Sequence, residues 1–349
     1  MPFVGLLLVA TLWSACVAQP VARPSTQPKK ASITTRSYDR KGWKLSVPHA
    51  IPYVELCRKA ATDDSTFATF KSKREYQYVL EHTDRNVAAR WIEFLAHAHP
   101  YLLHAPYLKR FQQNDLHGGS TLYDFGAVET HGGRMVTIGS MSPSTVKYMG
   151  NLAQLIDYFG RAKMERAQFC EIGGGYGGMA HIVLSFARHA RYQIFDLKEP
   201  TMLQSRYLRQ LGWSSEQAVA GVLNGPAACD IVLSNVALTE LEGKAQMEYA
   251  RSLMETAKVG VHVSVNIIAS SYMYPWLNML ARNRFDVAYA PMPVAFRAGH
   301  VTCAEVVARA GLAPANDSAQ VRDLKDMHRC DSTREAARWY AWFNFTIGS

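Results

Sequence analysis

The sequence has few cysteines, no detectable internal repeat and no apolar run long enough to cross a membrane. Its 6 cysteines among 349 residues are widely and irregularly spaced. This spacing excludes a disulfide-rich scaffold and a structural zinc site, because both need cysteines at short, regular intervals. The longest apolar stretch runs from Phe3 to Ala18, roughly 16 residues, whereas a membrane-crossing helix needs about 20. We therefore expect no stable membrane span. No zinc finger or arginine-rich arm is present, so we also expect no nucleic-acid partner.

The N-terminal apolar stretch is instead typical of a secretion signal. It ends in small residues that are followed by Gln19 and Pro20, as a cleaved signal would. We predict that residues 1–18 are removed, in preference to being retained as a signal anchor, and that the chain enters the secretory pathway. Two N-glycosylation sequons, at Asn316 and Asn344, agree with this route and predict a glycoprotein. Residues 19–42 are rich in Pro, Ser, Thr and Lys, which predicts a flexible leader.

The remaining composition is that of a globular protein with a basic surface. Apolar residues make up 48% of the chain, enough for a sizeable core, and the formal net charge is +9. This charge favours anionic partners such as acidic glycans, nucleotide sugars or membrane surfaces. Cys170 and Cys229 lie in apolar, strand-like runs. We interpret both as small buried core residues, so that any disulfide would form among the other cysteines.

Residues 43–141 are predicted to form an N-terminal helical and loop extension. From Asp63 to His99, apolar residues recur at steps of three and four, which predicts two amphipathic helices, the second ended by Pro100. The segment from Leu116 to Gly139 is rich in Gly and His and has no period. It predicts loops and short strands.

Residues 142–349 are predicted to form the main domain, which opens with a helix. Ser142 is placed to cap this helix, Pro143 occupies its first position, and Gly160 ends it. Apolar strands and amphipathic helices then alternate, the rhythm of a mostly parallel sheet with helices on both faces. Strands are expected over 167–172, 192–196, 229–235 and 260–268, and helices over about 179–189, 201–211 and 244–258.

A run of glycines follows the first of these strands, in the sequence FCEIGGGYGGMAH from Phe169 to His181. Gly173, Gly175 and Gly178 have the G-x-G-x-x-G spacing that lets a nucleotide-like ligand approach the backbone where a parallel strand turns into a helix. This spacing is compatible both with a dinucleotide and with S-adenosylmethionine.

Glu171 favours the second ligand. A carboxylate at the strand end would repel a pyrophosphate on the same loop, whereas it would attract the ammonium and sulfonium groups of S-adenosylmethionine. Asp196, at the end of the next strand, can accept hydrogen bonds from both ribose hydroxyls, which NAD would also use. The alternative for Glu171 is a carboxylate that only caps the free N–H groups of the glycine turn.

These residues resemble motif I of the class I S-adenosylmethionine-dependent methyltransferases, with Glu171, Gly173, Gly175 and Gly177 in register. Together with SPSTVKY, which ends at Tyr148, and the pair Asp196-Leu197, they are similar to the sugar O-methyltransferase family. The similarity covers roughly residues 142–268. The chain departs from the family pattern at DLKEP, where the family continues DLPE. It departs again at SNVALTEL, which retains only Ser234 and Glu240 of a serine-rich stretch. Both departures bear on the acceptor rather than on the cofactor.

The resemblance implies a Rossmann-like α/β fold with a central, mostly parallel seven-stranded sheet, and methyl transfer to a sugar hydroxyl of a glycan or glycoconjugate. The expected cofactor-binding residues are Glu171, Gly173, Gly175, Tyr176, Gly177, Gly178, Asp196 and Leu197. Tyr176 has two readings, since it either packs over the cofactor or fastens the loop to the core.

Transfer to a hydroxyl also needs a base or a metal ion to remove its proton. Glu240, just beyond the third strand, is the leading candidate, with the alternative that it only favours the dipole of the next helix. His131 and His300, in glycine-containing loops, are rival bases. His181 and His262 are interpreted as packing residues. Magnesium is possible but not supported, because adjacent carboxylates are lacking after the third strand.

The sequence therefore predicts a secretory-pathway O-methyltransferase that uses S-adenosylmethionine. Two alternatives remain open. One is an NAD(P)-dependent oxidoreductase, based on the shared glycine spacing. The other is a non-catalytic protein that keeps the methyltransferase fold as a binding surface.

Overall fold

The computed structural model describes residues 50–81, 83–241, 243–264, 276, 279–280, 283, 285–291 and 304–310. The predicted signal, the leader, both sequons and His300 lie outside these ranges. Within them, every helix is too short or too polar to cross a membrane. All the described residues belong to one unit, which spans Ser37–Ser349.

The N-terminal part is a series of short helices. They are α1 (Ala50–Thr62), α2 (Asp64–Thr69), the 3-10 turn η1 (Phe70–Ser72), α3 (Arg74–Leu80), α4 (Arg85–Ala98), η2 (Pro100–Leu103), α5 (Tyr107–Gln112) and η3 (Gln113–Asp115). The first of the two helices predicted here is thus interrupted by η1, because the chain turns to bury Phe70 and Lys71. Helix α4 ends before Pro100 as predicted.

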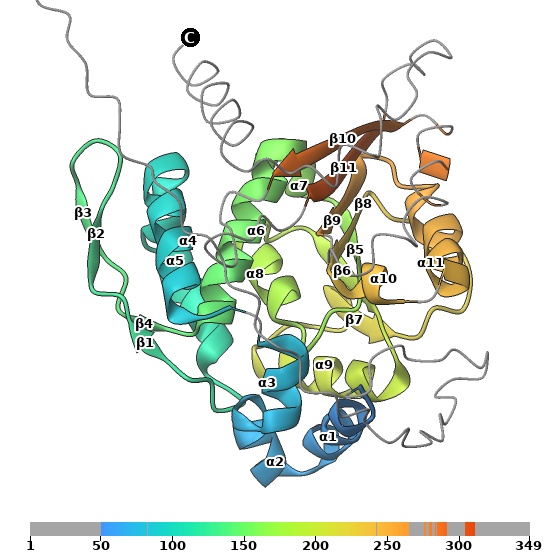
Figure 1. Cartoon of the computed structure of the whole chain (residues 1–349), viewed down its shortest axis with the longest axis horizontal. Helices are drawn as coiled ribbons and strands as arrows, with labels where there is room; N and C mark the ends of the chain where they lie inside the picture. The colour runs from blue at the N-terminus through green and yellow to red at the C-terminus, as the bar shows by residue number, and fades with distance from the viewer. Residues whose placement is uncertain are drawn as a thin grey trace, which may run out of the picture. The chain divides into compact units, whose positions relative to one another are not determined.

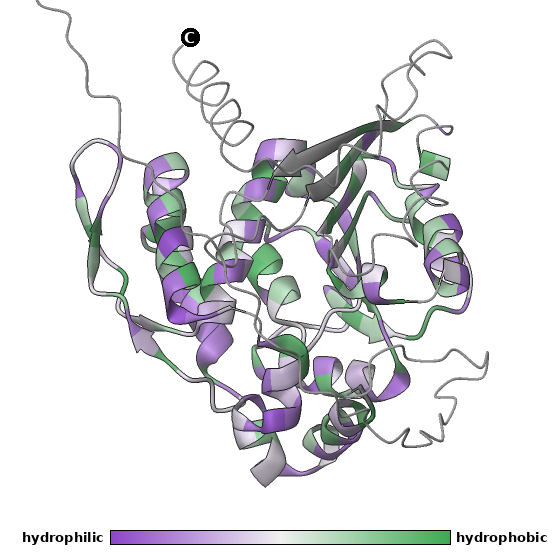
Figure 2. Ribbon diagram, in the orientation of Figure 1, coloured by the Kyte–Doolittle hydropathy of each residue, from purple (hydrophilic) through white to green (hydrophobic). Residues whose placement is uncertain are grey.

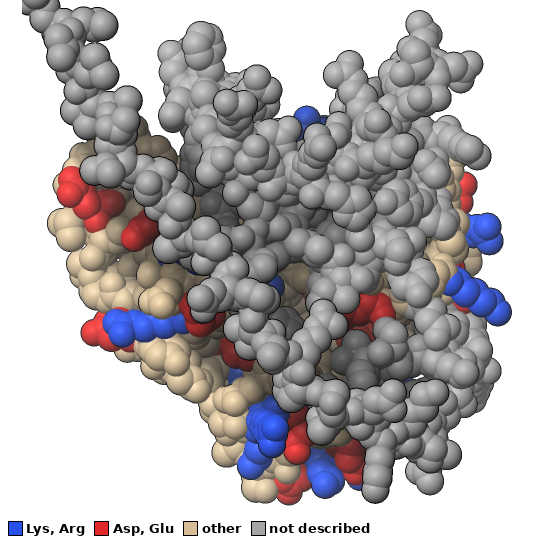
Figure 3. Space-filling view, viewed as in Figure 1, with Lys and Arg blue, Asp and Glu red and all other residues tan. Residues whose placement is uncertain are grey.

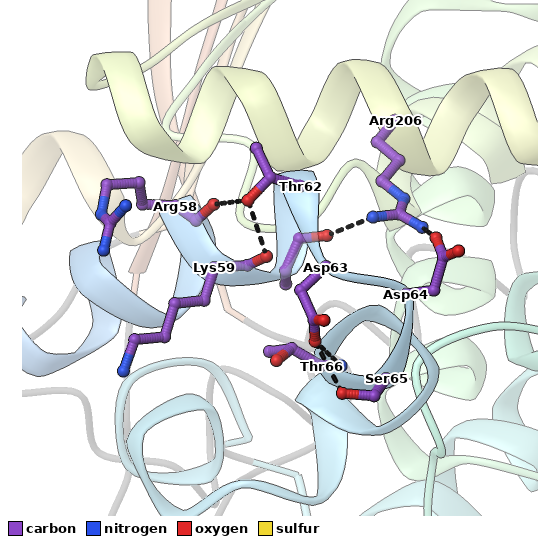
Figure 4. Close-up of polar contacts among 9 residues, drawn as sticks. Arg58, Lys59, Thr62, Asp63, Asp64, Ser65, Thr66 and Arg206 are labelled. Atoms are coloured by element: carbon purple, nitrogen blue, oxygen red, sulfur yellow. Dashed lines mark hydrogen bonds and ion pairs between the residues drawn. The ribbon is translucent and has the colours of Figure 1, made fainter.

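A hydrogen bond and an ion pair from Arg206 fix α1 and α2 against α9 (Lys198–Gln210) (Figure 4). Asp63 caps α2 by accepting from the backbone N–H of Thr66 at 2.6 Å. Arg206 of α9 reaches across, donates to the carbonyl of Ala60 at 3.2 Å and pairs with Asp64. The first helices are therefore anchored to a helix of the main domain.

Two small antiparallel pairs follow, as expected for a segment of loops and short strands. Strand β1 (Tyr123–Asp124) pairs with β4 (Ser140–Met141), and β2 (Ala127–Glu129) pairs with β3 (Met135–Thr137). Figure 1 shows both pairs at the left edge, on the far side of α4 and α5 from the central sheet.

The central sheet has the order β10-β11-β9-β8-β5-β6-β7. Its strands are β5 (Gln168–Ile172), β6 (Arg191–Phe195), β7 (Ala218–Gly221), β8 (Ile231–Asn235), β9 (Gly260–Ser264), β10 (Phe285–Pro291) and β11 (Ala304–Ala310). Strands β7, β6, β5, β8 and β9 pair in parallel, whereas β11 is antiparallel to both β9 and β10. The mostly parallel α/β sheet predicted from the sequence is confirmed. The strand order reverses at β5, and ligands of such sheets bind at a reversal of this kind.

Helices cover both faces of this sheet. They are α6 (Pro143–Phe159), α7 (Arg161–Met164), α8 (Gly178–Phe186), α9, α10 (Ala237–Glu240) and α11 (Gly243–Tyr249), which continues as a π-helix over Ala250–Met254. As predicted, Ser142 caps α6 and Gly160 ends it. One core packs α4, α6 and α8 on one face, and a second packs α11 and the π-helix on the other. Figure 2 shows α8 as almost entirely apolar, consistent with its burial between layers.

The described surface mixes charges of both signs. On the face shown in Figure 3, acidic and basic side chains are interspersed over α1 to α3. In the basic group Lys71-Ser72-Lys73-Arg74, Lys73 and Arg74 are exposed, whereas Lys71 is buried.

The cysteine interpretation was wrong for two residues. Cys170 of β5 and Cys229, just before β8, form a disulfide with a Cα–Cα distance of 5.8 Å. Both are buried in the same core cluster, so burial was correct and the free-thiol state was not. The residues are 59 positions apart and meet only because β8 lies beside β5, which spacing in the sequence does not reveal. Cys57 of α1 is a free, buried thiol.

Candidate functional site

The glycine loop joins β5 to α8 at the point where the strand order reverses. Gly173, Gly175 and Gly177 have φ values of 71°, 57° and 95°, a region that L side chains rarely adopt. A Cβ on Gly173 would also lie 2.2 Å from the Cβ of Ala237. Backbone conformation and close packing therefore both require glycine here.

Glu171 ends up buried beneath this loop, with 1% of its surface exposed. The Tyr192 hydroxyl donates to its Oε2 at 3.0 Å, and Asn235 Nδ2 donates to its Oε1 at 3.5 Å. Burial raises the pKa of the Glu171 carboxyl to about 8, and the charge of Asp196 adds to this effect, while the two hydrogen bonds oppose it. Because both donors are side chains of neighbouring strands, the structure does not give Glu171 the alternative role of capping the glycine turn.

Asp196 lies at the carboxyl end of β6, beside β5. Its Oδ1 accepts from the backbone N–H of Leu197 at 2.8 Å, and its Oδ2 accepts from Gln204 Nε2 at 2.8 Å. Burial raises the pKa of the Asp196 carboxyl to about 6, although these bonds and one from the N–H of Gly174 lower it. The sheet thus places two carboxyls at neighbouring strand ends. Burial raises the pKa of both, so a positively charged ligand would stabilise their ionised forms.

Gln204 is a site residue that sequence reasoning missed. The same amide nitrogen that donates to Asp196 also donates to the carbonyl of Gly175, at 2.9 Å. Gln204 therefore ties the glycine loop to the end of β6. It lies two turns into α9 and belongs to no sequence motif, and the structure identifies it by its burial and these two hydrogen bonds.

Asn235 and Asn151 form a second group that the sequence did not indicate. Asn151 Nδ2 of α6 donates to Asn235 Oδ1 at 2.7 Å, and Asn235 in turn donates to Glu171. The next residue, Val236, has a φ of 73°, which is strained for a β-branched side chain. Such strain is often kept where a ligand binds, so this turn marks the rim of the candidate site.

Tyr176 fastens the loop to the core, the second of its two predicted readings. Its side chain is 1% exposed, and its hydroxyl accepts from Asn114 Nδ2 at 2.9 Å. Its ring packs edge-on against that of Tyr207, with centroids 4.9 Å apart. The ring therefore lies among α9 and the N-terminal helices.

The N-terminal helices also cover the loop directly. The Tyr53 hydroxyl of α1 donates to the carbonyl of Gly175 at 3.3 Å. A Cβ on Gly175 would meet both Cδ atoms of Leu80 at 3.4 Å. The extension before residue 142 is therefore part of the candidate site.

Two of the three candidate bases, Glu240 and His131, lie in the described residues, on different parts of the fold. Glu240 is the last residue of α10, whose first residue, Ala237, contacts Gly173. His131 is exposed at the turn between β2 and β3, where its ring packs on His97 of α4, so the structure does not bring it to the loop (Figure 1). His300 lies outside the described residues. Of the two described residues, only Glu240 belongs to an element, α10, that contacts the glycine loop.

The two histidines interpreted as packing residues are both buried. His181 Nε2 contacts the carbonyl of Arg110 at 2.9 Å, and Trp213 Nε1 donates to His181 Nδ1 at 3.0 Å. Burial lowers the pKa of His181 to about 4, so this ring is neutral at physiological pH. His262 of β9 packs on Tyr158, with ring centroids 5.6 Å apart.

Metal ligands and surface hollows give no second site near the glycine loop among the described residues. No group of three or more His, Cys, Asp or Glu that could hold a metal ion occurs in the part of the chain that the structure describes. A surface hollow is lined by Arg166, Gln168, His189 and Arg191. It lies at the amino ends of β5 and β6, at the opposite edge of the sheet from the glycine loop.

Comparison with known proteins gives structural similarity alone. No family model matches the chain, and neither does any curated protein sequence. Among solved structures, magnesium protoporphyrin IX methyltransferase from Synechocystis with bound S-adenosylmethionine is 12% identical, with a TM-score of 0.36, over 47% of this chain and 78% of that one. An O-methyltransferase from neocarzinostatin biosynthesis, in complex with S-adenosyl-L-homocysteine and 1,4-dihydroxy-2-naphthoic acid, is 17% identical, with a TM-score of 0.33, over 48% and 58%. A tRNA methyltransferase from B. subtilis is 16% identical, with a TM-score of 0.34, over 46% and 65%.

Proposed function

We propose that the chain is an S-adenosylmethionine-dependent O-methyltransferase that acts on a sugar hydroxyl of a glycan or glycoconjugate. The observation that carries the proposal is the buried carboxyl of Glu171, held under a glycine loop at the reversal of strand order. A cationic ligand on that loop would stabilise the ionised form of the carboxyl, whereas the pyrophosphate of NAD would gain no attraction from it.

The residues fit S-adenosylmethionine by their chemistry. Asp196 is held by Gln204 and by the N–H of Leu197, and it keeps acceptor capacity for ribose hydroxyls. Gly173, Gly175 and Gly177 form a tight turn with positive φ values and add no side chain of their own that would obstruct a ligand. When bound, S-adenosylmethionine would supply an electrophilic methyl group on a sulfonium.

The chain's own contribution to transfer is alignment, exclusion of water and removal of a proton. Helices α1 and α3 cover the loop through Tyr53 and Leu80, which supports exclusion of water. Glu240 is proposed to accept the proton of the acceptor hydroxyl, and His300 remains the alternative base. The sugar acceptor is supported by the resemblance of SPSTVKY and of the glycine run, and by the positive net charge.

Residence in the secretory pathway is part of the proposal. It is supported by the apolar N-terminal stretch, the two sequons and the buried Cys170–Cys229 disulfide. Disulfides persist in oxidising compartments and are rare in the cytosol.

The decisive test is calorimetry with the purified chain, lacking residues 1–18. S-adenosylhomocysteine is expected to bind more tightly than NAD. Glu171→Gln and Asp196→Asn should each weaken this binding about tenfold or more, whereas Glu93→Gln, an exposed carboxylate of α4, should leave it unchanged. Tighter binding of NAD would overturn the proposal.

Incubation with labelled S-adenosylmethionine and fractionated host glycans then tests the acceptor class. Incorporation of label into a glycan fraction would support the sugar acceptor. Retained cofactor binding without transfer to any fraction would favour the non-catalytic alternative.

A further inference from the structure

Lys71 is a buried cation that the proposed chemistry does not use. It lies in η1 of the N-terminal extension and is 4% exposed. Its Nζ donates to the carbonyl of Asn114 at 2.8 Å and to the Tyr207 hydroxyl at 3.1 Å. The same nitrogen lies 4.2 Å from the centroid of the Tyr176 ring and 4.7 Å from that of Tyr207.

This environment holds an ammonium without an ion pair. Within the described residues, no carboxylate lies within ion-pair distance of Lys71, so two aromatic faces and a carbonyl compensate its charge. Burial lowers the pKa of Lys71 to about 7, although the more distant carboxylates of Asp115 and Glu81 raise it. A side chain of this kind costs folding free energy, and its retention calls for a functional reason.

The partners of Lys71 connect it to the glycine loop. Tyr176 belongs to that loop, and Tyr207 lies one turn after Gln204, which bonds Gly175 and Asp196. Asn114 donates through the two hydrogens of its Nδ2 to the hydroxyls of Tyr176 and Thr145, each at 2.9 Å. The ammonium therefore lies between the loop and α9, where it contacts the side chains that fix both.

The same network explains the SPST segment at the start of α6. Asp115 Oδ2 accepts from the N–H of Ser142 at 2.9 Å, and its Oδ1 accepts from the Ser142 and Thr145 hydroxyls at 2.7 and 2.9 Å. Asn114 and Asp115 are adjacent in η3, so α6 and the Lys71 cluster share one support. The N-terminal extension thus reaches the glycine loop through a continuous set of buried bonds.

We propose that Lys71 is a positioning residue for the cofactor: its ammonium holds the Tyr176 ring, and with it the glycine loop, in the conformation that binds S-adenosylmethionine. This inference rests on the proposed function. It makes the N-terminal extension a component of the cofactor site.

The role gives cofactor affinity a pH dependence of defined sign. Lys71 is charged below pH 7, and it loses its proton and its attraction to the Tyr176 ring as the pH rises through about 7. The groups that face it are the carboxyls of Asp115 and Glu81, the His181 ring, and the hydroxyls of Tyr76, Tyr176 and Tyr207. Burial raises the pKa of all three tyrosines well above the ordinary value, so their hydroxyls do not titrate in this range.

The test compares full-length chains by calorimetry with S-adenosylhomocysteine at pH 6, 7, 8 and 9. Lys71→Met keeps the length of the side chain and removes its charge, and Lys73→Met, two residues away and exposed, is the control. The ratio of the dissociation constants of Lys71→Met and wild type should be about tenfold at pH 6 and should fall towards one by pH 9. Glu171 is present in both proteins, so its own titration cancels in this ratio. Lys73→Met should show a ratio of one throughout.

A second variant covers the case in which Lys71→Met does not fold. Tyr176→Phe keeps the ring and loses the bonds of its hydroxyl with Asn114 and Tyr148. The ratio of its dissociation constant to that of wild type should therefore stay constant between pH 6 and 9. Equal affinity of Lys71→Met and wild type at pH 6, or a ratio that does not change with pH, would show a structural role only and overturn the inference. If Lys71→Met is unfolded, a ratio of the dissociation constants of Tyr176→Phe and wild type that changes with pH has the same meaning. Failure of the wild type to bind at any pH would instead overturn the proposed function, and this inference with it.

Discussion

At the scale of single residues, the site is defined by carboxyls that the fold buries at a cost. Glu171 receives hydrogen bonds from Tyr192 and Asn235, and its pKa is nevertheless raised to about 8. Folding therefore favours the protonated form. Its ionised form becomes favourable when a positive ligand is supplied from outside, which is the behaviour expected of a binding group and not of a structural one.

The raised pKa predicts how stability depends on pH. A carboxyl with a folded-state pKa above the ordinary value of 4.5 contributes fully below pH 4.5 and loses that contribution as the pH rises to about 8. Glu171→Gln removes the loss, so it should raise the free energy of unfolding at pH 9 by on the order of 2–4 kcal/mol relative to wild type, with a much smaller effect at pH 4. Urea denaturation at both pH values measures this difference. An equal effect of the substitution at pH 4 and pH 9 would contradict it.

Glu240 has a different expected signature, because a general base acts on the transition state. Glu240→Gln should lower kcat about 100-fold or more while the dissociation constant of S-adenosylhomocysteine stays unchanged. Steady-state kinetics on the accepted glycan, with calorimetry alongside, separates the two quantities. A full rate in this variant would leave Glu240 with only a role at the helix dipole. His300 would then be the leading candidate for the base.

At the scale of elements, the sequence predicted best what depends on local signals. Ser142 and Gly160 mark the ends of α6 because capping and a glycine stop act within one turn of the chain. The parallel strands were visible as apolar runs for the same reason. The break at η1 was missed, because the chain turns there to bury Lys71 against Tyr176 and Tyr207, residues that lie over 100 positions away.

The same division holds within the candidate site. Glu171 and the glycines could be found because they form one short motif, and Asp196 could be found because it ends the next apolar strand. Gln204, Asn151 and Asn114 could not, since each is an ordinary amide whose role comes from the partner that the fold gives it. His131 was selected from its loop-like surroundings, which do not specify on which edge of the molecule a loop lies.

Packing between α4 and α6 gives a prediction at this scale. Gly150 of α6 faces the Trp91 ring of α4 so closely that a Cβ would lie 2.3 Å from Trp91 Cε3. Replacement of a helical glycine by alanine usually stabilises a protein by up to about 1 kcal/mol, but here overpacking should dominate. Gly150→Ala should therefore lower the free energy of unfolding by about 1–2 kcal/mol, as measured by urea denaturation.

Gly221 of β7 is the control for this substitution. Nothing lies within 4 Å of a Cβ built there, so Gly221→Ala should be neutral or slightly stabilising. A stabilising Gly150→Ala would mean that α4 and α6 can separate at little cost.

At the scale of the whole molecule, the disulfide joins the segments that carry the site. Cys170 immediately precedes Glu171, and Cys229 leads into β8, whose end supplies Asn235. The bond therefore ties the strand of Glu171 to the strand of its hydrogen-bond donor. It is also the feature most directly linked to the proposed compartment, because disulfides are rare in proteins of the cytosol.

Removal of this disulfide should lower the free energy of unfolding much more than removal of a free thiol. Closing a loop of 59 residues lowers the entropy of the unfolded chain, which corresponds to about 4 kcal/mol in the chain-entropy account. The Cys170→Ala, Cys229→Ala double variant should lose free energy of unfolding of this order. Cys57→Ala truncates a buried thiol that forms no bridge and should lose only about 1 kcal/mol. Urea denaturation of all three proteins, with and without dithiothreitol, makes the comparison. Only the wild type and Cys57→Ala should respond to the reductant, because they alone contain the bond, and an unfolding midpoint of the wild type that is unchanged by reduction would show that the bond does not support the fold.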